Sequence, residues 1–317
     1  MKAYVLVLVA SLALLSHPPT ATAAATNIYF TAFEAAEGYS TNLTLIGQGG
    51  WSGSGSGDNG VVNQYILGQG QQALIGGYST LPATKNTALW HFIDFFPVTS
   101  GYPIMNFSVL LNIADSLNNQ WDTFSWDFYN IQGDRLFSLD FDNYTNYLDV
   151  SFQLDGTNQS VLTPVRYVNN SNYTLNVTMN FASNRWSATL NNSLITTNQF
   201  ITTTNAPLNL GDIDPVWLVF NTNAPGDNYM LFDNYRVTAE TLPVTPAQVQ
   251  FLGRTGEGWG LLRVLGGNNT RWSLDATTNF VNWTAVKTNV ISGSYVDVVD
   301  TGAAGYSRRF YRARHVP

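Results

Sequence analysis

Short segments in which apolar and polar residues strictly alternate constrain the fold of this sequence more than any other feature. Between positions 173 and 181, every odd-numbered residue is apolar and every even-numbered residue is polar. Successive side chains of an extended strand point to opposite faces, so one face of this segment is apolar and the other is polar. The segment therefore predicts a strand that is buried on one side only.

The same pattern recurs along most of the chain. The further predicted strands have their apolar faces at Phe107–Ile113, Phe124–Phe128, Phe137–Phe141, Leu148–Leu154 and Trp186–Leu190, followed by the apolar run Val216–Phe220 and the alternating segment Tyr229–Asp233. Turn-forming residues separate them, and no long segment has a helical period. Strands at this spacing indicate an all-β protein built as an antiparallel sandwich or barrel.

The N-terminus has the three parts of a secretory signal peptide. Lys2 supplies a positive charge, residues 4–15 are apolar, and Ala21 and Ala23 have the spacing of a cleavage site. We expect residues 1–23 to be removed, with Ala25 as a second possible cleavage position. No other segment approaches the roughly 20 apolar residues of a transmembrane helix, so we expect a secreted, periplasmic or cell-surface protein without membrane insertion.

Charge divides the mature chain into two parts. Residues 24–242 carry 5 Lys and Arg against 17 Asp and Glu, whereas residues 243–317 carry 8 against 4. The change coincides with the proline-containing segment 240–250, which predicts a linker between domains at 24–239 and 251–317. The acidic larger part argues against nucleic acid and anionic membranes as partners.

The larger part resembles laminin G-like and concanavalin A-like jelly rolls, in the versions found in exported proteins of bacteria such as Verrucomicrobia and Planctomycetes. The residues that carry this resemblance are Phe33-Glu34, Glu37-Gly38-Tyr39, Gln48-Gly49-Gly50-Trp51, Gly70-Gln71-Gln72-Ala73-Leu74 and Phe232-Asp233-Asn234-Tyr235-Arg236-Val237. It covers about residues 27–240 and implies an antiparallel jelly-roll β-sandwich. That architecture hosts lectins, adhesins and glycosidases alike, so it implies no single function.

The C-terminal part resembles a short β-module that follows varied domains in secreted proteins of the same bacteria. The segment 272–284 and the residues 309–312 carry this resemblance. The alternation of Trp272, Leu274 and Ala276 independently predicts a small immunoglobulin-like or fibronectin type III-like β-sandwich.

The sequence shows no obvious catalytic motif. Glycosidases on the jelly-roll scaffold need two carboxylates across a sugar bond, often as Glu-x-Asp-x-x-Glu on one strand, and none of the four Glu residues forms that motif. The closest approach is Asp140 and Asp142, which share a face and are candidate ligand residues if that face forms a groove, or else two solvated aspartates. The chain has no cysteine, and only His91 and His315 remain after removal of the expected signal peptide, so thiolate and multi-histidine metal sites are excluded.

Aromatic side chains outside the predicted core are candidate sugar contacts. Trp51 follows a glycine-rich segment with no obvious core to enter, Trp121 precedes a strand whose inward face is already filled, and Tyr144 lies near several Asn residues. Flat aromatic rings stack on sugar rings, and Asn or Asp side chains bind the hydroxyl groups. The alternative at Trp51 and Trp121 is a ring that folds back onto the protein.

Calcium is the one inorganic partner that we expect. Jelly rolls often join their first and last strands through a hard cation, and Glu34 with Asp233 and Asn234 supplies oxygen ligands near the two ends of the larger part. The alternative is that Glu34 accepts hydrogen bonds from the backbone and Asp233 caps a strand.

These observations favour a secreted, non-catalytic β-sandwich protein that binds carbohydrate or another component of an extracellular surface. Two alternatives stay open. One is a polysaccharide-degrading hydrolase or lyase whose acidic residues come from separate strands, and the other is a structural protein of an envelope or matrix. A pair of carboxyl groups about 5 to 9.5 Å apart would favour the hydrolase.

Overall fold

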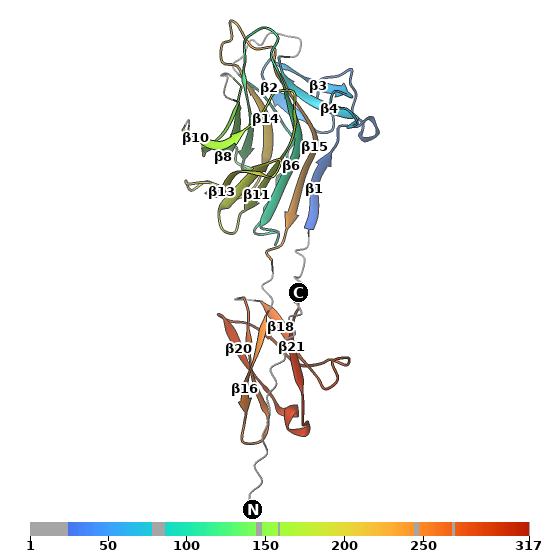
Figure 1. The fold of residues 1–317 in the computed structure, drawn as a ribbon, viewed down its shortest axis with the longest axis vertical. Helices are drawn as coiled ribbons and strands as arrows, with labels where there is room; N and C mark the ends of the chain where they lie inside the picture. The colour runs from blue at the N-terminus through green and yellow to red at the C-terminus, as the bar shows by residue number, and fades with distance from the viewer. Residues whose placement is uncertain are drawn as a thin grey trace, which may run out of the picture. The chain divides into compact units, whose positions relative to one another are not determined.

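The computed structural model of the protein describes residues 25–77, 86–143, 148–157, 159–243, 247–267 and 270–316 (Figure 1). The expected signal peptide lies outside these ranges. The chain forms two compact units, and the boundary between them in the sequence falls between Leu242 and Pro243. The predicted linker at 240–250 takes in strand residues at both ends, because one strand ends at Glu240 and the next begins at Gln248.

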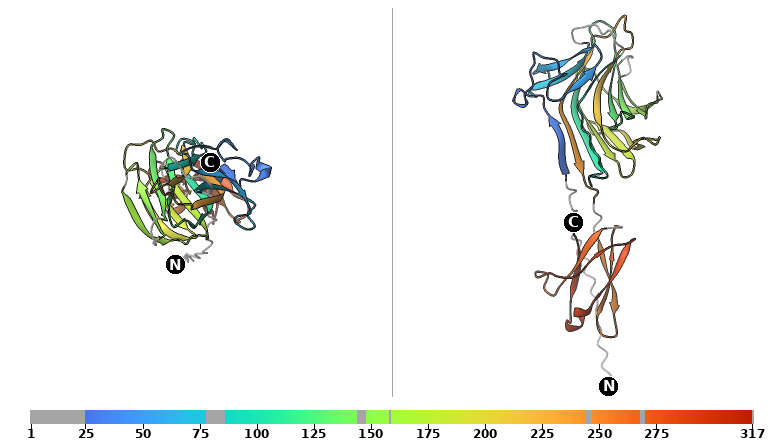
Figure 2. Two further views of the ribbon diagram at one scale, coloured as in Figure 1. Left: turned by 90° about the horizontal axis from the view of Figure 1, so that it is seen from above. Right: turned by 180° about the vertical axis from the view of Figure 1, so that it is seen from behind.

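The larger unit is a sandwich of two antiparallel sheets, which confirms the predicted fold class (Figures 1 and 2). The eight-stranded sheet has the order β13 (Ser193–Phe200), β12 (Arg185–Leu190), β11 (Asn172–Asn180), β6 (Ile104–Ala114), β15 (Tyr229–Glu240), β4 (Gln71–Gly76) and β3 (Asp58–Asn63), with β1 (Ala25–Thr31) also paired to β15. The seven-stranded sheet has the order β10 (Ser160–Arg166), β9 (Asp149–Leu154), β8 (Arg135–Asp142), β7 (Thr123–Tyr129), β14 (Asp212–Leu218), β5 (Asn86–Trp90) and β2 (Ser52–Ser54).

The core of the larger unit consists of the apolar faces that the alternation predicts. Leu175, Val177 and Met179 of β11 are fully buried, as are the alternate aromatic residues of β7 and β8. The rings of Phe128 and Phe137 stack with their centroids 4.3 Å apart, and Phe137 stacks in turn on Trp186 of the other sheet at 4.2 Å. Burial of large aromatic side chains contributes most of the stabilisation in such a core.

The smaller unit is a second antiparallel sandwich of two three-stranded sheets. Its strands are β16 (Gln248–Arg254), β17 (Gly260–Leu265) and β20 (Tyr295–Asp300) in one sheet, and β19 (Thr284–Val290), β18 (Arg271–Thr277) and β21 (Phe310–His315) in the other. Trp272 and Leu274 are buried in its core, as their alternation predicts. Among the residues that the structure describes, no helix is long and apolar enough to cross a membrane.

Trp51 is wrong as a candidate sugar contact, and the alternative of a ring that folds back onto the protein is confirmed. The side chain is only 1% exposed and belongs to the core, with its ring centroid 5.3 Å from that of Tyr235 and 5.7 Å from that of Phe33. The preceding glycines make this possible, because Gly49 has a positive φ and a Cβ there would lie 2.2 Å from the Tyr39 hydroxyl oxygen. The glycine-rich segment thus folds tightly and brings the tryptophan inward.

We expect Trp51→Ala to lower the free energy of unfolding by about 3–5 kcal/mol, because it removes a large, fully buried ring. Chemical denaturation followed by far-ultraviolet circular dichroism measures this change. Phe96→Ala is the control, since Phe96 is exposed and its replacement should change stability by less than about 1 kcal/mol. An equally small loss in Trp51→Ala would show that the ring does not pack in the core.

Candidate functional site

Four aspartates from three neighbouring strands lie on the outer face of the seven-stranded sheet. Asp127 of β7 is directly opposite Asp214 of β14 in the strand pairing, and Asp212 and Asp140 lie on the same face. The neighbouring residues in sequence, such as Trp126 and Ile213, point into the core, so alternation directs the acidic side chains outward. We call Asp127, Asp140, Asp212 and Asp214 the aspartate cluster.

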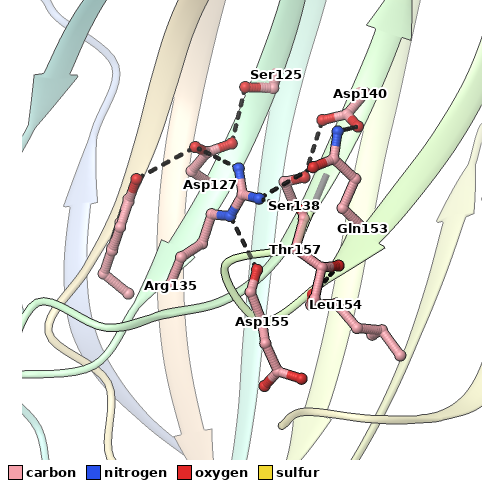
Figure 3. A network of polar contacts seen from close by, with 10 residues as sticks. Ser125, Asp127, Arg135, Ser138, Asp140, Gln153, Leu154, Asp155 and Thr157 are labelled. Atoms are coloured by element: carbon pink, nitrogen blue, oxygen red, sulfur yellow. Dashed lines mark hydrogen bonds and ion pairs between the residues drawn. The ribbon is translucent and has the colours of Figure 1, made fainter. Parts of the chain in front are cut away.

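Two members of the aspartate cluster are held by hydrogen bonds (Figure 3). Asp127 accepts from the Ser125 hydroxyl at 2.8 Å and from the Tyr129 hydroxyl at 3.3 Å, and Arg135 Nη1 lies 3.6 Å from its carboxylate. Asp140 accepts from the Ser138 hydroxyl at 2.9 Å and from Gln153 Nε2 at 2.8 Å.

Arg135 joins these two hydrogen-bonded groups. Its Nη2 donates to Gln153 Oε1 at 3.0 Å, and its Nε donates to the backbone oxygen of Asp155 at 3.0 Å (Figure 3). The guanidinium therefore connects Asp127 on one side to Gln153 on the other, and Gln153 in turn donates to Asp140. A planar group with several fixed donors holds such a network rigidly.

Asp212 and Asp214 have a different environment. Their carboxyl groups share a side-chain hydrogen bond when Asp214 is protonated. Apart from this pairing, Oδ1 of each is buried without a hydrogen-bond donor among the residues that the structure describes. The Asp214 residue is only 7% exposed. A buried acceptor without a donor costs free energy, and a water molecule or a ligand hydroxyl group would remove this cost.

Burial raises the pKa of every member of the aspartate cluster. The pKa of Asp140 and that of Asp212 rise to about 6, and the pKa of Asp127 also rises. The pKa of Asp214 lies well above its usual range because of burial and the nearby negative charges of Asp212 and Asp127. The cluster therefore keeps part of its protons near neutral pH, which is typical of functional sites.

An aromatic side chain lies beside the aspartate cluster. β5 and β14 pair at Ala88 and Val216, and the same register continues to Ile93, whose backbone nitrogen donates to the oxygen of Gly211 at 2.7 Å. This register places Trp90 next to Asp214. Leu89 points into the core, so alternation puts the half-buried Trp90 side chain on the outer face with the acids.

The predicted sugar contacts have mixed outcomes. Asp140 belongs to the cluster, and Asp142 lies two residues along β8 on the same face. Trp121 is half-buried at the end of the sheet, where its Nε1 donates to Asp115 Oδ1 at 2.9 Å. Trp51 lies in the core, and Tyr144 lies outside the described residues.

Four residues of this face are not predicted from the sequence: Asp127, Asp212, Asp214 and Trp90. The sequence does contain one indication of this face, because Asp212 and Asp214 are two residues apart, as are Asp140 and Asp142. The strand was predicted from the apolar run at 216–220, whereas β14 begins at Asp212 and so includes both acids.

The candidate cation ligands Glu34 and Asp233 lie close enough for their charges to interact. Asp233 is fully buried, accepts from the backbone nitrogen of Asn234 at 2.6 Å, and has a pKa raised to about 7 by burial and by the charges of Glu34 and Glu37. Glu34 Oε1 accepts from the backbone nitrogen of Gln71 at 3.1 Å, as the alternative expected. Within the described residues, no group of three or more Asp, Glu or His side chains has the arrangement of a metal site.

These residues fit a cation in part. A hard cation binds to carboxylate oxygens and would offset the repulsion that raises the pKa of Asp233. The Asn234 side chain fits less well, because its Nδ2 donates to Asp233 Oδ2 at 3.3 Å.

Comparisons with solved structures find many similar chains, among them the three that follow. The chain is similar to a sialidase (9% identity, TM-score 0.45), covering 67% of this chain and 18% of the sialidase. It is similar to the CBM2 module of the evolved Dit of Lactobacillus casei BL23 phage J-1 (9%, TM-score 0.47), with coverage of 69% and 98%. It is also similar to winged bean acidic lectin complexed with methyl-α-D-galactose (8%, TM-score 0.44), with coverage of 69% and 98%.

No protein-family profile matches the sequence. No curated protein sequence matches it either.

The raised pKa values predict that the stability of the larger unit falls as pH rises. A carboxyl group whose pKa is higher in the folded than in the unfolded state binds more protons when folded, so stability is lost between about pH 4 and the folded pKa, which is about 6 for Asp140. We expect Asp214→Asn to raise the melting temperature by about 2–6 °C at pH 8 and by much less at pH 4.5. Differential scanning calorimetry at both pH values measures this difference.

Asp134→Asn is the matched control, because Asp134 is exposed and outside the cluster. Its melting temperature should follow that of the unmodified protein at both pH values. An Asp214→Asn protein that melts lower at pH 8 would contradict the electrostatic cost that we assign to the cluster.

Proposed function

We propose that this protein binds an uncharged carbohydrate chain on the outer face of the seven-stranded sheet. The observation that carries the proposal is the buried carboxyl pair of Asp212 and Asp214, whose Oδ1 atoms have no donor within the described residues apart from each other's carboxyl group. The strand register aligns Asp214 of this pair with Trp90. Sugar hydroxyl groups donate to such acceptors, and the apolar face of a sugar ring stacks on an indole ring. Side chains fixed on strands would lose little conformational freedom on binding.

Charge supports an uncharged ligand. Residues 24–242 carry a large excess of Asp and Glu, and the aspartate cluster would repel phosphate, sulfate or uronate groups. Arg135 is already engaged with Asp127 and Gln153, so it is not available to neutralise an anion. Export through the N-terminal signal is part of this proposal, and it would bring the protein to glycans outside the cytoplasm.

A second candidate function is hydrolysis of the bound glycan. Asp127 and Asp214 are cross-strand neighbours, and the Cβ atoms of such neighbours are about 4.5–5.5 Å apart, so their carboxyl groups can flank one sugar bond. Asp214 would be the general acid, because burial and neighbouring charges keep it protonated. Asp127 would be the nucleophile or base, because Ser125, Tyr129 and Arg135 stabilise its ionised form.

Glycan binding is tested by affinity electrophoresis in gels that contain laminarin, xyloglucan, galactan or polygalacturonate. We expect retardation by at least one of the three neutral polymers and none by polygalacturonate. Trp90→Ala and Asp214→Asn should each weaken binding by about 10-fold or more, because the first removes the stacking surface and the second replaces one carboxyl oxygen by an NH2 group that cannot accept a hydrogen bond. Phe96→Ala is the control and should bind normally.

Two outcomes would contradict the proposal. One is the absence of retardation by every polymer, and the other is normal retardation of both Trp90→Ala and Asp214→Asn. Release of reducing ends from the retarding polymer then separates the two candidate functions. Hydrolysis that is lost in Asp127→Asn and Asp214→Asn supports catalysis, whereas binding without release supports a non-catalytic protein.

We also propose that Ca²⁺ binds at Glu34 and Asp233 and stabilises the larger unit. A cation at about 100 times its dissociation constant adds roughly 2.7 kcal/mol, which corresponds to a rise in melting temperature of about 5–10 °C. We expect this rise when CaCl₂ is added after treatment with a chelator, and we expect Asp233→Asn to abolish it. Superimposable melting curves with CaCl₂ and with chelator would exclude the site.

A further inference from the structure

A pocket of about 360 Å³ lies on the other side of the sandwich, over the outer face of the eight-stranded sheet. Six residues line it: Tyr65, Ile66, Leu67, Asn112, Asn170 and Asn172. Its volume is within the range of small-molecule sites, about 300–1,000 Å³. All six side chains are uncharged, in contrast to the aspartate cluster.

The floor of the pocket contains a buried acceptor without a partner. Asn112 of β6 is 6% exposed, and its Nδ2 donates to Asn172 Oδ1 at 2.7 Å. Its Oδ1 is buried and has no donor within the described part of the chain. With Asn112 Nδ2 used in this bond, the unpartnered atom is an acceptor that a ligand hydroxyl group would satisfy.

The wall of the pocket is a rigid loop between β3 and β4. The Gln72 side chain is fully buried, and its Oε1 accepts from the backbone nitrogens of Tyr65 at 2.9 Å and Ile66 at 3.1 Å. Ile66 packs on Leu74 and Leu231 in a small apolar cluster outside the main core. The hydrogen bonds to Gln72 and the packing of Ile66 thus hold the loop in place without a ligand.

The anchored loop leaves two apolar side chains at the mouth of the pocket. Leu67 is 86% exposed and Tyr65 is 45% exposed, although the Tyr65 hydroxyl is held by a hydrogen bond with the Tyr229 hydroxyl. The two aromatic rings also contact each other edge to face, with centroids 5.6 Å apart. An exposed leucine and a fixed tyrosine ring beside three amides offer both an apolar contact and hydrogen bonds to one ligand.

We infer that this pocket is a second ligand site, which binds one uncharged sugar residue through Asn112 Oδ1, with Tyr65 and Leu67 against an apolar face of the sugar ring. The site stands on observations that are independent of the aspartate cluster. Because the two sheets pack against each other, their outer faces point away from one another. A protein with both sites can hold two sugar chains, or two parts of a branched one, and gains avidity from the pair.

Methyl nuclear magnetic resonance distinguishes the two sites in one experiment. The methyl groups of Leu67 and of Ile66, which also lines the pocket, report on the pocket, and Ile66 is the reporter in Leu67→Ala. The Val216 methyl groups report on the outer face of the seven-stranded sheet. The probes are D-galactose, D-glucose and N-acetyl-D-glucosamine, each at about 50 mM, well above a millimolar dissociation constant. We expect at least one probe to shift the Leu67 resonances.

Substitutions then test the named contacts. Asn112→Ala should weaken binding at the pocket by about 10-fold or more, and Leu67→Ala by about 3- to 10-fold. Leu67 is exposed, so its replacement leaves the fold intact even if Asn112→Ala does not fold. The control is Leu117→Ala, which replaces an equally exposed leucine outside the pocket and should bind normally, as should Trp90→Ala at this site.

Each result decides one of the two sites. The second site is supported if a sugar shifts the Leu67 resonances and binds more weakly to the pocket variants. This conclusion does not depend on the Val216 resonances. A shift at Val216 alone overturns the second site and leaves the proposed function standing. The second site is also overturned if none of the three sugars shifts the Leu67 resonances. The same holds if the dissociation constant at the pocket is unchanged in both Leu67→Ala and Asn112→Ala.

Discussion

The contact on which the rest of the larger unit depends is the aromatic stacking between the two sheets. Phe128 stacks on Phe137 and Phe137 on Trp186, so β7, β8 and β12 are fixed relative to one another in the core. A strand has only two faces, and a slip of one residue would exchange them. Burying the aromatic residues of β7 therefore obliges Asp127 to face outward, where the register places it opposite Asp214.

Burial of the aspartate cluster lowers the stability of the folded state, and the loss differs from one aspartate to another. Asp127 has hydroxyl donors and a guanidinium nearby, whereas Asp214 is buried beside further carboxyl groups. Replacing such a group by a neutral amide would stabilise a protein that had no use for it, so an arrangement of this kind is characteristic of functional sites. Hydroxyl groups and a guanidinium favour the ionised form of Asp127, whereas burial and neighbouring negative charges favour the protonated form of Asp214.

Much of the fold could be predicted from the sequence, because alternation at 107–113, 137–141 and 175–179 depends only on the geometry of a single strand. The site could not, because it depends on pairing between β7 and β14, which lie far apart in the sequence. Trp51 shows the same limit, since its burial depends on contacts with Phe33 and Tyr235 that a local pattern does not contain. Asp140 could be predicted because alternation within its own strand places the acidic residues on one face and the aromatic residues on the other.

β15 connects the separate features of this unit. Its first residues pair with β4 and contribute Leu231 to the apolar cluster under the pocket loop, and its later residues pair with β1. Asp233 and Asn234 lie where the register shifts, and Asn234 has the positive φ that asparagine tolerates. Tyr235 lies within the same irregularity, is fully buried, and its hydroxyl donates to the backbone oxygen of Ile213 at 3.0 Å, between the two acids of β14. This hydrogen bond joins the irregular part of β15 to the backbone that carries Asp212 and Asp214.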